Sequence, residues 1–103
     1  MIYIFDIDGT ICTLVQNANY KQAKPFKSRI DKVNKLYSEG HEIKLYTARG
    51  SSTGIDWSEI TKEQLDKWGV KYDSLIMNCK PHGDIFIDDK AINADQFFDN
   101  DQK

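Results

Sequence analysis

Four segments of the chain that are predicted to be strands, 2–6, 42–47, 73–77 and 84–88, each lead into polar side chains that could do chemistry. In chain order these side chains are Asp6 and Asp8, Thr47, Lys80, and the pair Asp88 and Asp89. In an open parallel sheet ligands bind beyond the carboxyl ends of the strands, so we expect all six groups at one edge. Carboxylate oxygens without His or Cys partners favour Mg²⁺, ahead of Mn²⁺ and Ca²⁺. The pattern predicts a magnesium site that also binds an anion such as phosphate.

The charges at this edge predict a division of labour between the acids. Four crowded carboxylates repel one another and need a cation or a proton. Even with Mg²⁺ and Lys80 present the site stays negative, and a phosphate dianion would add to that charge. Protonating one carboxylate relieves the repulsion and makes that group a general acid. We expect Asp8 to carry the proton and Asp6 to face the metal and the phosphorus.

The remaining segments predict the elements that position these residues. Ser28 is a plausible N-cap for a helix through Glu39, and Gly40 suits the position after its end. A second helix is expected from Asp56 to about Trp68, and a last one over 91–98, while 9–27 and 49–54 are expected to be irregular. Strands that alternate with helices predict a single α/β domain over 1–103. Its expected architecture is a three-layer sandwich, a Rossmann-like parallel sheet with helices on both faces.

Composition excludes several classes of protein. The net charge of −2 argues against nonspecific nucleic-acid binding. One basic group, Lys21, Lys24, Lys27 and Arg29, is expected to be solvated. Two cysteines do not suggest a disulfide framework. Neither a signal peptide nor an apolar run long enough to cross a membrane is visible, so the chain is expected to be cytoplasmic.

The motifs in this order resemble those of the haloacid dehalogenase (HAD) superfamily, in its phosphatase branch. DIDGT at 6–10 resembles the first motif and LYTARG at 45–50 the second, which is a strand ending in Thr or Ser. CKPHGD at 79–84 and FIDDK at 86–90 resemble the third and fourth. Together the motifs span residues 6 to 89. The short chain and the stretch KPHGDIFIDDKAIN at 80–93 resemble, more narrowly, the small phosphatases of capsule polysaccharide biosynthesis.

The resemblance implies an enzyme, a phosphoric monoester hydrolase. Asp6 would be the nucleophile that forms an aspartyl-phosphate. Asp8 would protonate the leaving oxygen and later activate water. Thr47 would donate a hydrogen bond to the phosphoryl group, and Lys80 would neutralise its charge.

The resemblance also implies ligands for Mg²⁺ and for the substrate. Asp6, the backbone carbonyl of Asp8 and Asp88 would hold the metal, with Asp89 a further ligand, direct or through water. Gly9 would allow a tight turn past the phosphate, and Thr10 would help to order that loop. Arg49 would either grip a second anionic group or form a structural salt bridge. Two further residues are expected to be structural: His82 in a loop, and Trp57 in the core or, alternatively, lining a pocket.

The spacing between motifs leaves no room for a cap domain. Only 17 residues separate Thr10 from Ser28, and 32 separate Thr47 from Lys80. We therefore expect an active site that is open or is closed by another subunit of a homo-oligomer. An open site suits a phosphosugar or polysaccharide precursor, with the segments 11–27 and 49–56 setting specificity.

Three alternatives remain at this stage. One is a nucleotide or polynucleotide 3′-phosphatase, against which the lack of basic charge counts. Another is a receiver-like phosphoacceptor, which also gathers acids, a Thr and a Lys at parallel strand ends. In receivers, however, the adjacent acid pair follows the first strand, whereas here the adjacent pair comes last. The third is a phosphate-binding module without turnover.

Overall fold

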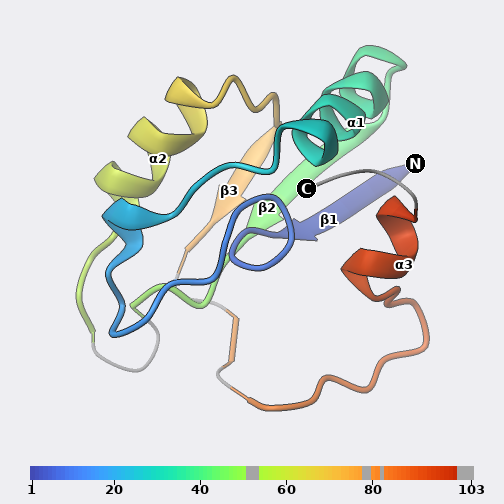
Figure 1. Ribbon diagram of the computed structural model, residues 1–103. Coiled ribbons are helices and arrows are strands. Elements are labelled where there is room, and N and C mark those ends of the chain that lie inside the picture. The colour runs from blue at the N-terminus through green and yellow to red at the C-terminus, as the bar shows by residue number, and fades with distance from the viewer. Residues whose placement is uncertain (51–53, 78–79, 82, 100–103) are drawn as a thin grey trace.

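The computed structural model describes residues 1–50, 54–77, 80–81 and 83–99. Its elements run in the order β1, η1, α1, β2, α2, β3, α3 (Figure 1). The strands are β1 (Ile2–Asp6), β2 (Glu42–Tyr46) and β3 (Ser74–Ile76). The helices are α1 (Lys27–Ser38), α2 (Ser58–Lys67), α3 (Ala94–Phe98) and the 3₁₀ helix η1 (Tyr20–Gln22). In the part of the chain that is described, no helix is long and apolar enough to cross a membrane.

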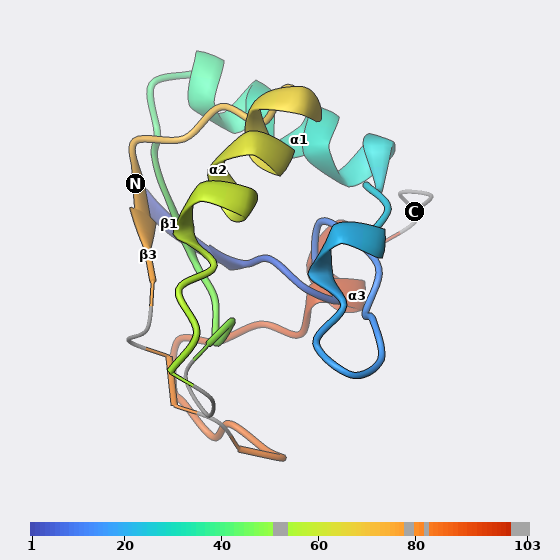
Figure 2. The ribbon, with the colours of Figure 1, turned by 90° about the vertical axis from the view of Figure 1, so that its left-hand side faces the viewer.

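The three strands form one parallel sheet in the order β1-β2-β3. Both crossovers move in the same direction across the sheet, and right-handed crossovers then place both helices on the same face. Figure 2 views the sheet near its edge, with α1 and α2 on one side of the strands. The predicted α/β class with a parallel sheet is confirmed.

The core lies between this helical layer and one face of the sheet. Phe5 of β1 pairs in register with Leu45 of β2, so the two side chains share a face, and both are buried. They pack in one cluster with Ile30 and Val33 of α1 and Leu65 of α2, all buried. The spacing of these helical residues is that of an amphipathic helix with one apolar face.

The predicted helix layer on the second face of the sheet is not confirmed. Ile2 and Ile4, which point to that face, are each 59% exposed. Helix α3 instead packs on the same face as α1, where the ring of Phe98 lies 6.1 Å from that of Phe5. In the described residues the fold therefore has two layers, because Phe98 of α3 is buried and Phe97 partly buried against the helical face of β1.

The predicted fourth strand, 84–88, is wrong: these residues form no strand. Ile85 is 80% exposed and Ile87 is 95% exposed. An alternating apolar pattern is local, whereas a strand also needs backbone hydrogen bonds to a neighbouring strand, and among the described residues β1 pairs with β2 alone. The segment runs beyond the carboxyl end of the sheet (Figure 1).

Other boundaries shift by one to three residues. Helix α1 begins one residue before Ser28, with Phe26 at its N-cap. Helix α2 begins at Ser58, whose backbone N–H donates to the Asp56 carboxylate over 2.9 Å. Helix α3 begins three residues later than predicted because Asn93 caps it, accepting from the N–H of Asp95.

One substitution at two positions tests this arrangement of the sheet. Ile43→Ala removes a fully buried side chain of β2 and should lower the free energy of unfolding by about 2–5 kcal/mol. Ile87→Ala removes an exposed side chain and should change it by less than about 0.5 kcal/mol. Urea denaturation of both variants measures the difference. Equal losses would show that 84–88 packs as a fourth strand after all.

Candidate functional site

The end of β1 and the loop after it present Asp6 and Asp8 on the same side of the chain, because Ile7 between them turns into the core and is fully buried. The Asp6 carboxylate accepts the N–H of Ile7 over 2.9 Å. Gly9 follows with a φ of 81°, and a Cβ there would lie 3.2 Å from a methyl group of Leu14. The tight turn predicted at Gly9 is therefore present, and it requires a residue without a side chain.

Lys80 reaches Asp6 from a distant part of the chain. Its Nζ lies 2.9 Å from Asp6 Oδ2 and about 5.0 Å from the ring centres of Tyr46 and Phe86. Burial raises the pKa of the Asp6 carboxyl above its ordinary value, and the Lys80 ammonium opposes that shift. Lys80 therefore favours the ionised form of Asp6, which is the form that a nucleophile needs.

Asp8 is held by a different cation. Arg49 donates from Nε to Asp8 Oδ2 over 3.0 Å and from Nη2 to Asp8 Oδ1 over 2.8 Å, a bidentate pair. The Arg49 side chain is 0% exposed. Of the two roles predicted for Arg49, the salt bridge is the one present in these contacts.

Helix α2 and the segment 13–24 fix the guanidinium. Arg49 Nη1 donates to Thr61 Oγ1 over 3.0 Å and to Gln64 Oε1 over 2.6 Å. The Tyr20 ring lies 4.6 Å from the guanidinium carbon. The sequence analysis missed Thr61 and Gln64, although their spacing of three places both on one face of a helix. Two polar residues beside the apolar face of α2 could have indicated that this helix contacts a buried polar group.

Thr47 and Cys12 complete the surroundings of Asp8. Thr47 is buried, and its hydroxyl donates to Asp8 Oδ2 over 3.4 Å while accepting the N–H of Arg49 over 3.1 Å. The Cys12 thiol donates to Asp8 Oδ1 over 3.5 Å. Burial, together with the Asp8 charge, raises the pKa of Cys12 to about 12, so it stays a thiol near neutral pH.

Arg29 corrects the expectation of a fully solvated basic group. It is buried, and it donates to the carbonyl of Thr10 over 3.2 Å and to Asp95 over 2.6 Å. Its guanidinium carbon also lies 4.9 Å from the ring centre of Phe98. Arg29 thereby ties the loop at Thr10 to α3, in agreement with an ordered loop after the DIDGT motif.

Asp6, Asp8, Gly9, Thr10 and Lys80 all line one cavity of about 830 Å³. Asp88 lines it too, whereas Asp89 is not among its lining residues. The backbone N–H of Lys90 donates to Asp88 and lowers the pKa of its carboxyl. Asp84 and Asp95 also line the cavity and were missed by the sequence analysis. His82, for which a loop role was predicted, and Cys79 lie outside the described residues.

The donors around the cavity suit a hard cation, but their described arrangement does not gather them around one point. Of its five carboxylates, three lie within salt-bridge distance of a cation, namely Asp6, Asp8 and Asp95. Asp84 and Asp88 form no salt bridge with any described residue, and a divalent cation would offset their negative charge. In the described ranges, however, no three His, Cys, Asp or Glu residues lie close enough together to hold a metal ion.

Comparison with solved structures finds two similar chains. One is the crystal structure of a protein from Vibrio cholerae, with a TM-score of 0.80 and 28% sequence identity, covering 93% of this chain and 85% of that one. The other belongs to the structure of a Pnkp1/Rnl/Hen1 complex, with a TM-score of 0.61 and 21% identity. The alignment covers 98% of this chain and 34% of the chain from the complex. At this sequence identity the similarity shows a shared fold alone. No protein-family model and no curated protein matches the chain.

A double-mutant cycle tests whether Arg49 and Asp8 form the structural centre of the site. Arg49→Met leaves the Asp8 carboxylate without its buried partner and should cost about 3–5 kcal/mol of unfolding free energy. In Asp8→Asn/Arg49→Met the loss should be smaller than the sum of the single losses by about 1–3 kcal/mol. Urea denaturation gives all four values. Additive losses would mean that the pair contributes nothing as a pair.

Proposed function

We propose that the protein is a Mg²⁺-dependent phosphomonoester hydrolase of the HAD type, working through an aspartyl-phosphate on Asp6. The observation that carries the proposal is the separation of the two carboxylates. Asp6 faces the Lys80 ammonium at the cavity, and Asp8 faces the Arg49 guanidinium behind it. Two acids with different partners can perform two different roles in one reaction.

In the first step a carboxylate oxygen of Asp6 attacks phosphorus, and the bond from phosphorus to the leaving oxygen breaks. Lys80 offsets negative charge on Asp6 and on the incoming phosphoryl group. Asp8 delivers the proton to the leaving oxygen. Because both oxygens of Asp8 accept from Arg49, taking up that proton requires one of these hydrogen bonds to be given up.

In the second step water attacks the phosphorus of the acyl-phosphate, which releases phosphate and restores the Asp6 carboxylate. Asp8 accepts the proton from that water. The described arrangement supports this role directly, because Arg49 and Thr47 hold the Asp8 carboxylate in one orientation. Orientation of the base by a third group is common to enzymes that use covalent catalysis.

We propose that Mg²⁺ is held by Asp6, the backbone carbonyl of Asp8 and Asp88, with Asp89 as a further ligand. Bound there, the ion would offset charge on the phosphoryl oxygens. Asp84 and Asp88, which form no salt bridge within the described residues, support a divalent cation at this cavity. That Asp6, the Asp8 carbonyl and Asp88 gather around one ion when it binds is part of this proposal.

The proposed substrate is a phosphosugar or a polysaccharide precursor. An open cavity of about 830 Å³ suits a substrate larger than phosphate alone. A nucleotide or polynucleotide 3′-phosphatase is the second candidate, favoured by the likeness of fold to a chain of the Pnkp1/Rnl/Hen1 complex. The net charge of −2 weighs against a polynucleotide.

Release of inorganic phosphate tests the proposal. With Mg²⁺, the protein should release phosphate from at least one of a set of hexose phosphates, nucleotides and 3′-phosphorylated oligonucleotides, and EDTA should abolish the release. Asp6→Asn and Asp8→Asn should each reduce kcat by at least about 10³-fold, because each removes a reacting group. Gln96→Ala, an exposed amide on α3, is the control and should remain active. Full activity in Asp6→Asn would refute the mechanism.

The dependence of kcat/KM on pH tests the role of Lys80. Since burial raises the pKa of Asp6 and Lys80 opposes the shift, Lys80→Met should raise that pKa further. The acidic limb of the profile, where Asp6 takes up a proton, should therefore move to higher pH. Lys67→Met, at the end of α2, is the matched control and should leave the limb in place. A limb that stays or moves to lower pH in Lys80→Met would contradict the assignment.

A further inference from the structure

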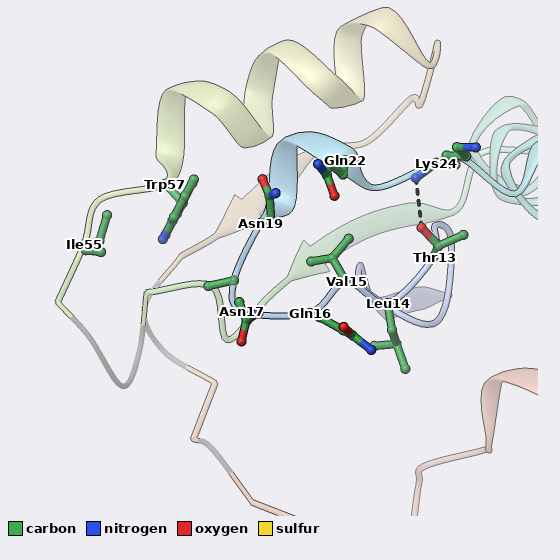
Figure 3. A pocket seen from close by; sticks show the side chains of 11 residues that line it. Thr13, Leu14, Val15, Gln16, Asn17, Asn19, Gln22, Lys24, Ile55 and Trp57 are labelled. Atoms are coloured by element: carbon green, nitrogen blue, oxygen red, sulfur yellow. Dashed lines mark hydrogen bonds between the residues drawn. The ribbon is translucent and has the colours of Figure 1, made fainter.

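A second cavity, of about 690 Å³, adjoins the cavity that contains Asp6 and Asp8. Two segments line it, 13–24 and 55–57, and Figure 3 shows their side chains around it. Leu14 lines both cavities and packs beside Gly9, in the loop that carries the two aspartates. The two cavities therefore meet at Leu14, which separates the second cavity from the one that Asp6 lines.

The lining of this second cavity is polar and almost uncharged. Side-chain amides come from Gln16, Asn17, Asn19 and Gln22. An amide both donates and accepts hydrogen bonds, as a hydroxyl group does. Lys24 is the one ionisable side chain among its described lining residues. The lining therefore suits a neutral group that carries several hydroxyls, and without an acidic side chain among its described residues it does not suit a peptide cation.

Trp57 supplies an aromatic wall and links the cavity to Asp8. Its ring packs edge to face with Tyr20, the centroids 5.0 Å apart. The same Tyr20 ring lies against the guanidinium of Arg49, which holds Asp8. A group bound against Trp57 is thus connected to Asp8 through three side chains in contact, those of Trp57, Tyr20 and Arg49. The apolar face of a sugar ring packs well against such a wall, while its hydroxyls reach the amides.

We propose that this cavity binds the leaving group of the phosphomonoester, and that this group is a neutral, hydroxyl-rich ring such as a hexose. The inference rests on the proposed function and adds to it a binding site for the part of the substrate beyond the phosphate. Four amides around one aromatic wall favour a ring with a hydroxyl on most of its carbons. A nucleobase, which depends mainly on stacking, makes less use of them.

Steady-state kinetics with matched probes tests the site. The variant is Gln16→Ala/Asn17→Gly; Gly suits position 17 because φ there is 56°. The probes are glucose 1-phosphate, glucose 6-phosphate, adenosine 3′-monophosphate and phenyl phosphate. KM for the better glucose phosphate should rise about tenfold, as expected for two lost hydrogen bonds, while KM for phenyl phosphate stays within about twofold. Gln96→Ala, which lines neither cavity, should match the unmodified protein. An equal rise for phenyl phosphate, or a preference for the nucleotide, would overturn the inference.

A binding measurement separates failure of the site from failure of the proposed function. Glucose, galactose and N-acetylglucosamine, without phosphate, are titrated while the two tryptophan indole N–H resonances are followed by NMR. At least one sugar should shift the Trp57 resonance and leave that of Trp68 unchanged, and the shift should be lost in Gln16→Ala/Asn17→Gly. This result in a protein that releases no phosphate would support the cavity as a sugar site and refute the hydrolase. Phosphate release from phenyl phosphate with no shift of Trp57 by any sugar would refute the cavity and leave the hydrolase standing.

Discussion

The buried ion pair between Arg49 and Asp8 is the constraint on which the candidate site depends. A guanidinium with no exposed surface is tolerated only when its donors are satisfied, and here the loop after β1 and helix α2 supply the acceptors. The ring of Tyr20 in η1 packs against the guanidinium as a third contact. The pair therefore sets where α2 and the segment 13–24 lie relative to the end of β1.

The same pair gives the two aspartates different surroundings although one residue separates them. Asp6 stands at the cavity wall beside Lys80, and its burial makes the ionised form costly. Asp8 stands deeper against Arg49, Thr47 and the thiol of Cys12, all of which donate to it. A carboxylate that is exposed to substrate and one that is fixed in orientation behind it are the two components that covalent phosphoryl transfer needs.

The sequence predicted those parts of the fold that depend on local pattern. The apolar run of β1, the alternation of β2 and the apolar faces of α1 and α2 were enough to place these elements within one or two residues. The segment 84–88 has the same kind of pattern, but a strand also needs backbone hydrogen bonds to a neighbouring strand, and a local pattern does not show whether these form. The position of α3 could not be derived either, because it depends on contacts of its aromatic rings with Phe5, which is distant in the sequence.

The candidate site divides in a similar way. Parallel strands bring the residues at their carboxyl ends to one edge of the sheet. The structure has contacts there between Thr47 and Asp8 and between Lys80 and Asp6. What Arg49 binds depends on which polar residues of α2 turn inward, and Thr61 does so in a helix whose other buried residue is Leu65. The amide-lined cavity beyond Leu14 depends on the backbone path of an irregular segment, which has no periodicity to read.

Chemical trapping of the phosphorylated residue tests the central claim most directly. An acyl-phosphate is reduced by borohydride to an alcohol, so a phosphorylated aspartate becomes homoserine and is located by peptide mass spectrometry. The protein is quenched during turnover of its best substrate, and Asp6→Asn is treated in parallel as the control. Homoserine at position 6 of the unmodified protein, and none in Asp6→Asn, is the result predicted here. Homoserine at another aspartate, or steady release of phosphate with none at position 6, would contradict the account.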